Sequence, residues 1–261
     1  MSDRYGLIGK QISYSKSKVI HQHMAKKLNL DIVYDMIDCE EEDLPKIIKK
    51  LRHGEYQGFN VTIPYKQKII RFIDELTPKA RRIGAVNTLY VRNDHVIGDN
   101  TDYDGFLGLL TKHEIDVKDQ SVYLLGTGGA AKASYIVLKD LGAKVTVVTR
   151  SIDENKGFFD RVITYTMISP KDVSIYVNTT PLGTSPKIDE AVLEKRLVTD
   201  QTIVDLIYNP QKTKLMTYSK QSYNGLYMLI IQALKSEEIW FNRKIDISLS
   251  LLNELKEVIY S

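Results

Sequence analysis

Residues 121–150, SVYLLGTGGAAKASYIVLKDLGAKVTVVTR, constrain the fold more than any other segment, because they place a glycine-rich turn between an apolar strand and a helix. Glycines permit a tight turn and let the backbone approach a pyrophosphate, whose charge is favoured at a helix N-terminus. The turn GTGGAA (126–131) departs from the usual G-x-G-x-x-G spacing, so Ala130 or Ala131 would provide the close helix packing. The segment favours a dinucleotide site over a plain tight turn.

The second strand of this unit ends at Thr149 and is followed directly by Arg150. A site for NAD usually carries Asp or Glu here to bind the ribose 2′-hydroxyl, whereas an arginine suits a 2′-phosphate. Ser151 offers a hydroxyl and Lys156 a second cation. The position favours NADP over the alternative that Arg150 is an ordinary surface residue.

Strand-like and helix-like segments alternate along the chain. In the first hundred residues the strand candidates are 5–9, 31–38, 58–63 and two strands within 85–100, with helices expected at 18–28, 41–54 and 67–76. After the glycine turn, further strands are expected at 162–167, 174–180 and 202–208, mostly with helices between them, and the chain closes with helices at 225–241 and 246–260. This alternation predicts an α/β fold with a parallel sheet and helices on both of its faces.

The segment NVTIPYK (60–66) places a lysine just after a strand. Pro64 lacks the N–H that a central strand needs, so the strand should end there. Lys66 would then lie past the carboxyl end of a strand, where open α/β sheets bind their ligands. Taken alone, this lysine is more simply interpreted as a solvated surface residue.

Composition excludes several classes of function. The 261 residues include 36 Lys and Arg against 33 Asp and Glu, and a net charge of +3 gives no reason to expect a nucleic-acid partner. Cys39 is the only cysteine, and the five histidines show no metal-ligand spacing, so neither a disulfide nor a metal site is expected. The start MSDRYGLIG has no apolar signal region and no stretch is long enough to span a membrane, so we expect a cytoplasmic protein.

Seven segments occur in the order found in one enzyme family: ISYSKSK (12–18), NVTIPYK (60–66), AVNTL (85–89), GDNTDYDG (98–105), GTGGA (126–130), VNTTPLGT (177–184) and GLYMLIIQ (225–232). Together they resemble the shikimate dehydrogenase family, including its quinate/shikimate branch. The resemblance implies an N-terminal substrate domain with a mixed sheet, over residues 1–102, completed by 238–261. It also implies a Rossmann-like NADP domain over residues 103–237.

The resemblance implies an NADP-dependent, reversible reduction of 3-dehydroshikimate to shikimate, on the route to chorismate and the aromatic amino acids. Lys66 matches the family's catalytic lysine and Asp102 its acidic partner. A lysine with an ordinary pKa near ~10.4 is mostly an acid at neutral pH, so it can donate a proton to the oxygen formed from a ketone. We treat the two residues as a coupled pair and leave open which of them carries the proton.

The resemblance also implies a set of binding residues. Substrate-binding residues would be Ser15, Ser17, Thr62, Asn87, Asp102, Tyr208 and Gln232. Cofactor-binding residues would be Gly126, Thr127, Gly128, Gly129, Ala130, Thr149, Arg150, Ser151, Leu206 and Gly225. Ser15 and Ser17 would bind the substrate carboxylate, although plain helix capping explains them as well. The partner is thus expected to be a small molecule, and the protein a monomer or homodimer.

The chain departs from the family pattern at a few positions. Tyr14 stands where the family usually has His, and Lys18 where it usually has Pro. Asp153 and Glu154 place carboxylates close to the expected 2′-phosphate site, where the family often has a second basic residue. They weaken the preference for NADP.

Three alternatives remain. The nearest is a quinate or dual-specificity dehydrogenase of the same family that uses NAD, which activity on quinate would identify. A methylenetetrahydrofolate dehydrogenase shares the two-domain plan and an active-site lysine, but GDNTDYDG has no reason to exist there. A non-catalytic protein that retains only cofactor binding would need neither Lys66 nor Asp102.

Overall fold

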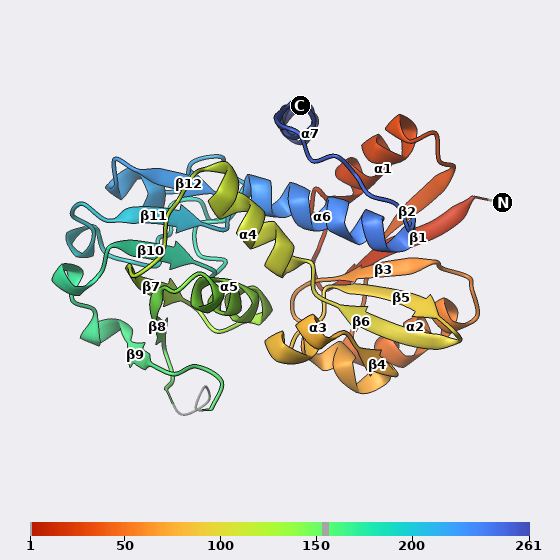
Figure 1. Ribbon diagram of the computed structural model, residues 1–261, viewed down its shortest axis with the longest axis horizontal. Helices are drawn as coiled ribbons and strands as arrows, with labels where there is room; N and C mark the ends of the chain where they lie inside the picture. Colours follow the sequence, from red (N-terminus) through yellow and green to blue (C-terminus); the bar gives the residue numbers. More distant parts are fainter. Residues whose placement is uncertain (1, 153–156) are drawn as a thin grey trace. The chain divides into compact units, whose positions relative to one another are not determined.

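The computed structural model describes residues 2–152 and 157–261, which form two compact units, each built on a six-stranded sheet (Figure 1). The first unit comprises Met1–Gly105 and Ile230–Ser261, and the second comprises Phe106–Leu229. One sheet is mixed and the other is parallel, so the predicted α/β class is confirmed. In the part of the chain that the structure describes, no helix is both long enough and apolar enough to cross a membrane.

The sheet of the first unit has five strands in one direction and a single antiparallel strand, β5. The strand order is β2 (Ile32–Asp38), β1 (Asp3–Gly9), β3 (Gly58–Val61), β5 (Thr88–Arg92), β6 (His95–Asp99) and β4 (Glu75–Leu76). Its register places Asn60 opposite Thr88, and Thr88 opposite Asp99. The residues that flank these three positions therefore lie close together, where β3 and β6 end and β5 begins.

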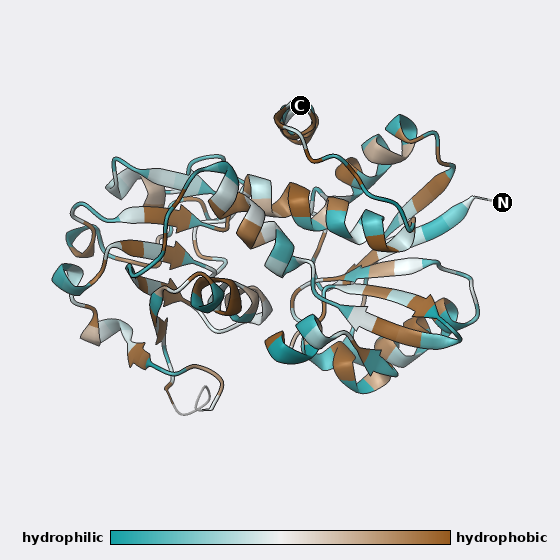
Figure 2. Ribbon diagram, viewed as in Figure 1, coloured by the Kyte–Doolittle hydropathy of each residue, from teal (hydrophilic) through white to brown (hydrophobic). Residues whose placement is uncertain are grey.

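The alternation of side chains along β3 divides the first unit into two cores. Phe59 and Val61 pack with the apolar face of helix α2 (Leu44–Arg52). Asn60, between them, points to the opposite face, where helices α1 (Ser17–Lys27) and α6 (Leu226–Trp240) provide its contacts. The unit also contains α3 (Pro78–Ile83), the start of α4 (Asp102–Lys112) and α7 (Leu249–Tyr260). Figure 2 shows the apolar residues concentrated on the strands and on the helix faces.

The second unit has an entirely parallel sheet. Its order is β12 (Ser222–Asn224), β11 (Thr202–Asp205), β10 (Ile175–Asn178), β7 (Ser121–Leu125), β8 (Lys144–Thr149) and β9 (Val162–Thr164). Helix α5 (Gly129–Asp140) follows β7, as the glycine turn predicts, and its Ala133, Val137 and Leu138 are buried. Strands buried on both faces explain the near-continuous apolar runs in this half of the sequence.

The structure corrects the predicted helix over 67–76. Lys68–Phe72 forms only a short 3₁₀ helix, and Glu75–Leu76 is strand β4. The Asp74 backbone N–H donates to the Val96 carbonyl at 3.0 Å, and the Asp74 side chain accepts from the Val96 N–H at 2.7 Å. The backbone thus pairs with the start of β6 instead of closing another helical turn.

The predicted helices between the later strands are also corrected. Over the described part of the segment from β8 to β12, the connections contain only short 3₁₀ helices: Tyr165–Met167, Pro170–Asp172, Lys195–Leu197 and Leu215–Tyr218. Prolines at 170, 181, 186 and 210 recur in these connections, and a proline cannot donate the hydrogen bond that continues a helix.

The chain returns to the first unit at Ile230, earlier than the expected residue 238, and leaves it after Gly105, later than the expected residue 102. Buried polar contacts explain why the chain rejoins the first unit within α6. Ser236 and Glu237 are fully buried, and they hydrogen-bond to Asn60 and His21 of the first unit. Polar groups without water must find protein partners, so these residues belong with the unit that provides them.

Candidate active site

Lys66 and Asp102 form an ion pair in the first unit. The Lys66 Nζ lies 2.5 Å from Asp102 Oδ2, and only 15% of the lysine side chain and 5% of the aspartate side chain are exposed. A solvated surface lysine would be far more accessible, so the interpretation of Lys66 as an ordinary surface residue is wrong. A charge-assisted hydrogen bond with so little water around it holds both groups in one geometry.

Two hydrogen bonds to distant segments hold Lys66 after the end of β3. Tyr65 is buried, and its hydroxyl donates to the Cys39 carbonyl at 2.6 Å, which fixes the residue before the lysine. The Lys66 carbonyl accepts from the Val86 N–H at 2.7 Å, which fixes the lysine backbone itself. The segment is therefore held on both sides of the residue whose side chain reaches the aspartate.

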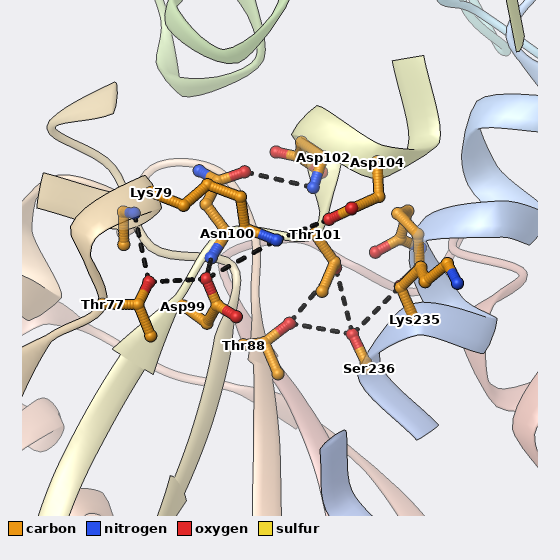
Figure 3. A network of polar contacts seen from close by, with 12 residues as sticks. Thr77, Lys79, Thr88, Asp99, Asn100, Thr101, Asp102, Asp104, Lys235 and Ser236 are labelled. Atoms are coloured by element: carbon orange, nitrogen blue, oxygen red, sulfur yellow. Dashed lines mark hydrogen bonds and ion pairs between the residues drawn. The ribbon is translucent and has the colours of Figure 1, made fainter. Parts of the chain in front are cut away.

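Asp102 is the first residue of α4, and the preceding Asn100 holds its backbone. Asn100 is fully buried, its Oδ1 accepts from the Asp102 N–H at 3.1 Å, and its Nδ2 donates to the Ala85 carbonyl at 2.8 Å. Figure 3 shows Asn100 joining the turn before α4 to the sheet edge. Asp102 therefore starts a helix, where an ionised carboxylate is favoured.

Asn87 provides the second hydrogen bond to the aspartate. The Thr101 backbone N–H lies 2.7 Å from Asn87 Oδ1, and because a backbone N–H can only donate, the amide oxygen must face it. Nδ2 then faces Asp102 Oδ1 at 2.9 Å. The same nitrogen lies 3.3 Å from Gln232 Oε1 on α6. The structure thus brings together four of the residues predicted from the sequence: Lys66, Asp102, Asn87 and Gln232.

The serines at the start of α1 form a local pair. Ser15 Oγ lies 3.1 Å from Ser17 Oγ and accepts from the Ser17 N–H at 3.3 Å, although the N-cap residue of α1 is Lys16. Thr62 follows β3, and its N–H donates to the Ile8 carbonyl at 2.9 Å. A Cβ at Gly9 would lie 2.6 Å from Thr62 Cγ2, so β1 and Thr62 approach as closely as they do only because residue 9 is glycine. Tyr14, which stands where the family usually has His, is 46% exposed.

The glycine turn of the second unit connects β7 to the N-terminus of α5. Gly126 follows β7 with a φ of +107°, and a Cβ there would lie 2.7 Å from Thr179 Oγ1. Gly128 is the N-cap of α5, and no atom lies within 4 Å of the place that a Cβ would take. Thr127 lies between these glycines, and Gly129 and Ala130 begin the helix. The first turn of α5 contains no acidic residue.

Thr149, Arg150 and Ser151 follow one another at the carboxyl end of β8. Thr149 is buried, Arg150 is exposed, and the Ser151 N–H donates to Thr149 Oγ1 at 3.4 Å. Asp153, Glu154 and Lys156, which bear on the 2′-phosphate interpretation, lie outside the described residues.

The remaining predicted residues lie beyond the carboxyl end of β11. Gly225 is buried and its N–H donates to the Ile207 carbonyl at 3.0 Å. A Cβ at Gly225 would lie 1.9 Å from the Leu206 carbonyl oxygen, so this position has no room for a side chain. Tyr208 follows two residues after Leu206.

Asp205, which the sequence analysis did not select, is buried directly before Leu206. Burial raises the pKa of its carboxyl to about 6, against the hydrogen bonds that Thr213, the Ile207 N–H and Asn178 donate to it. The Thr213 hydroxyl donates to Oδ2 at 2.6 Å, and Asn178 Nδ2 donates to Oδ1 at 2.9 Å. The carboxylate is thus well partnered but kept from water.

We expect Asp205→Asn to make the stability of the second unit less dependent on pH. A carboxyl with a pKa of about 6 in the folded state and 3.8 in the unfolded chain binds more protons when folded, so its contribution to stability is full below about pH 4 and falls as the pH rises to about 6. The loss is about 2 to 3 kcal/mol. Relative to wild type, the variant should gain stability between pH 4 and pH 7 in urea titrations. A constant difference between the two proteins would contradict the expectation.

Several residues around the candidate site were missed by sequence reasoning. They are polar and buried: Asn60, Thr88, Asn100, Thr101 and Ser236. The available signal was a polar residue inside an apolar strand or helix, as at Asn60 in GFNVTI and Ser236 in α6. Among residues 2–152 and 157–261, no group of three or more His, Cys, Asp or Glu side chains lies where it could hold a metal ion.

Comparison with known proteins places the chain in a family. Residues 7–89 match the family described as the shikimate dehydrogenase substrate binding domain. Over 266 aligned positions the chain is 38% identical to the shikimate dehydrogenase (NADP(+)) of Clostridium beijerinckii, with 98% of this chain and 96% of that protein covered. The chain belongs to the shikimate dehydrogenase family.

Solved structures of this family share the fold over nearly the whole chain. The 1.5 Å crystal structure of shikimate dehydrogenase 1 from Peptoclostridium difficile matches with a TM-score of 0.93 and 36% identity, covering 98% of this chain and 99% of that one. The enzyme from Thermus thermophilus, solved in complex with NADP(H) and shikimate, matches with a TM-score of 0.88 and 27% identity, covering 99% and 98% of the two chains. Both units of this protein therefore have the family architecture.

Proposed function

We propose that this protein catalyses the NADP-dependent, reversible reduction of 3-dehydroshikimate to shikimate, a step toward chorismate and the aromatic amino acids. The observation that carries the proposal is the shielded pair of Lys66 and Asp102, 2.5 Å apart, with Asn87 on the second carboxylate oxygen. Family membership and the NADP(+)-dependent relatives support the same activity. The enzyme would act on a small molecule in the cytoplasm, as a monomer or homodimer.

The first unit would bind the substrate and the second the cofactor. The residues of the second unit fit a dinucleotide: open space beside Gly128, the N-terminus of α5 and the absence of an acidic residue in its first turn suit a pyrophosphate. Thr127, Gly129 and Ala130 would complete the turn, and Thr149, Arg150 and Ser151 would bind the adenosine 2′-phosphate. Leu206 and Gly225 would lie at the nicotinamide, and Tyr208 near the substrate. When bound, NADPH supplies the hydride.

Lys66 and Asp102 would transfer the proton to and from the reacting oxygen. Reduction of the ketone leaves an alkoxide, to which the Lys66 ammonium donates a proton, and oxidation of the alcohol requires that proton to be removed. Asp102 holds the ammonium in place and is itself held by Asn87, so the pair acts as a unit rather than as independent groups. Lys66 also polarises the carbonyl before the hydride arrives.

The other predicted residues would select the substrate. Ser15 and Ser17 would bind its carboxylate at the start of α1, where the helix N-terminus favours a negative charge. Thr62, Asn87 and Gln232 would hydrogen-bond the ring hydroxyls. A site built to hydrogen-bond hydroxyl groups rejects analogues that lack them, because its polar groups are then left unpaired.

The test follows the absorbance of the reduced cofactor with shikimate or quinate, each combined with NADP or NAD. Turnover confined to shikimate with NADP is the expected result. Preference for quinate or NAD would assign the protein to the quinate branch and show that Arg150 does not read a 2′-phosphate. The absence of turnover with every pair would refute the proposed activity. Static light scattering of the same preparation determines the oligomeric state.

We expect Gly128→Ala to weaken NADP binding without weakening the fold. The backbone at Gly128 has a φ of −71°, which alanine adopts freely, and an added Cβ would meet no protein atom. The methyl group would instead occupy the space through which the backbone approaches the pyrophosphate. The KM for NADP should rise about tenfold or more, as for one lost charge-assisted contact, while the KM for shikimate and the thermal midpoint stay the same. An unchanged KM for NADP would place the pyrophosphate elsewhere.

A further inference from the structure

Behind the Lys66–Asp102 pair lies a buried cluster of three hydroxyl groups: Thr88, Thr101 and Ser236. Ser236 Oγ lies 2.8 Å from Thr88 Oγ1 and 3.1 Å from Thr101 Oγ1, and all three residues have no exposed surface (Figure 3). Ser236 is on α6, one turn after Gln232. Thr88 is the first residue of β5, and Thr101 lies between β6 and α4. The cluster therefore joins the helix that carries Gln232 to strand β5, which begins directly after Asn87.

The orientation of the Asn60 amide beside this cluster follows from one backbone carbonyl. The Asn87 carbonyl can only accept, so the Asn60 side-chain group 3.2 Å from it must be the Nδ2 amine. The same Nδ2 donates to Ser236 Oγ at 2.9 Å, which makes the serine an acceptor there. Its own single hydrogen has two acceptors within reach, the Gln232 carbonyl at 3.1 Å and Thr88 Oγ1 at 2.8 Å, and the shorter contact is the one to Thr88.

From Thr88 the series of hydrogen bonds continues to Asp102. The Thr88 hydroxyl donates to Asn87 Oδ1 at 3.0 Å, and Asn87 Nδ2 donates to Asp102 Oδ1 at 2.9 Å. When Ser236 donates to Thr88, every donor in the series Asn60, Ser236, Thr88, Asn87 points toward the carboxylate that binds Lys66. Hydrogen bonds aligned in one direction in a dry interior polarise one another, so each strengthens the next.

Ser236 is held in place by the rest of α6. The neighbouring Glu237 is fully buried, and its Oε1 lies 2.8 Å from Nδ1 of the buried His21 on α1. His21 Nε2 lies 3.1 Å from Asn60 Oδ1, so the amide that donates to Ser236 is contacted from its other side as well. Ser236 therefore has little freedom to move away from Thr88.

We propose that Ser236 is a positioning residue, which acts through Thr88 to hold the Asn87 amide toward Asp102 and so aligns the Lys66 ammonium. The role rests on the proposed reductase function. Ser236 is not placed at the substrate; its effect on the reaction passes entirely through Asn87.

The test is a double-mutant cycle of Ser236→Ala and Asn87→Ala, with kcat and both KM values measured well below the thermal midpoint. Ser236→Ala should lower kcat about tenfold, as for one misaligned hydrogen bond, and leave the KM for NADP unchanged. In the Asn87→Ala background the same substitution should change kcat less than about twofold, because the residue through which it acts is gone. Thr88→Val, which removes the intermediate hydroxyl at nearly constant volume, should lower kcat as Ser236→Ala does.

Ser134→Ala is the matched control. Ser134 is also fully buried in a helix, and among the described residues its hydroxyl has no hydrogen-bond partner. A fall in kcat for Ser236→Ala no larger than that for Ser134→Ala would overturn the proposal, as would a fall of equal size with and without Asn87.

Failure of the proposed function is recognised separately, because the wild-type enzyme would then turn over no substrate. In that event crystal structures of wild type and Ser236→Ala decide. A turned or displaced Asn87 amide in the variant supports the positioning role, and an unchanged amide overturns it.

Discussion

Lys66→Met should lower kcat for the reduction of 3-dehydroshikimate by about 10³-fold, within the range lost when a positioned proton donor is removed. Methionine is similar in length but has no proton to give, so the reacting oxygen loses both its donor and its nearest positive charge. The substitution also leaves the Asp102 carboxylate, 5% exposed, without its cation, and we expect the thermal midpoint to fall. Rates are therefore compared at temperatures where circular dichroism shows both proteins folded.

Two control variants separate chemistry from stability. Lys66→Arg keeps the positive charge beside Asp102, so the fold should be retained, but its guanidinium is too weak an acid to exchange the proton and kcat should still fall at least about 10²-fold. Lys68→Met removes a more exposed lysine two residues away, one paired with Glu41, and should leave kcat unchanged. Activity of Lys66→Met close to that of wild type would remove Lys66 from the mechanism.

Gly225→Ala should strongly destabilise the second unit. The new Cβ would lie 1.9 Å from the Leu206 carbonyl oxygen and 2.4 Å from its carbonyl carbon, both backbone atoms that cannot rotate away. Either β11 or the start of α6 must shift, which also strains the Gly225 N–H bond to the Ile207 carbonyl. Overpacking of this kind costs about 3 kcal/mol, which corresponds to a fall of roughly 10 °C in the thermal midpoint.

Differential scanning calorimetry measures this effect, with Gly128→Ala as the control that adds the same methyl group to open space. The two variants should differ by roughly the full 10 °C. Equal midpoints for Gly225→Ala and wild type would show that Leu206 and Gly225 separate without cost. The prediction would then fail even if cofactor binding were lost.

Local sequence determined the elements whose own residues specify them. The segment 121–150 became β7, α5 and β8 because its apolar runs, glycine turn and helix-forming residues agree with one another. The position of Lys66 after a strand followed from Pro64, and the order of the motifs identified the family. The prediction of a helix at 67–76 was wrong because the Asp74 backbone pairs with Val96. This partner is 22 residues away and cannot be predicted from the local sequence pattern.

Only the tertiary structure decided which polar side chains share one buried site. Asn60, Asn87, Asp102 and Ser236 come from four separate segments, and each alone is an ordinary polar residue in its strand, turn or helix. Their contacts depend on the register of β3, β5 and β6 and on the return of α6 at Ile230, which are set by packing between distant parts of the chain. Hydrogen-bond direction is likewise a tertiary property, because the backbone carbonyl of Asn87 and the N–H of Thr101 fix how the amides point. The sequence thus determined the fold class and the family and predicted Lys66 and Asp102 as the catalytic pair, while the arrangement that aligns these two residues is a consequence of burial, where every polar group must find its partner within the protein.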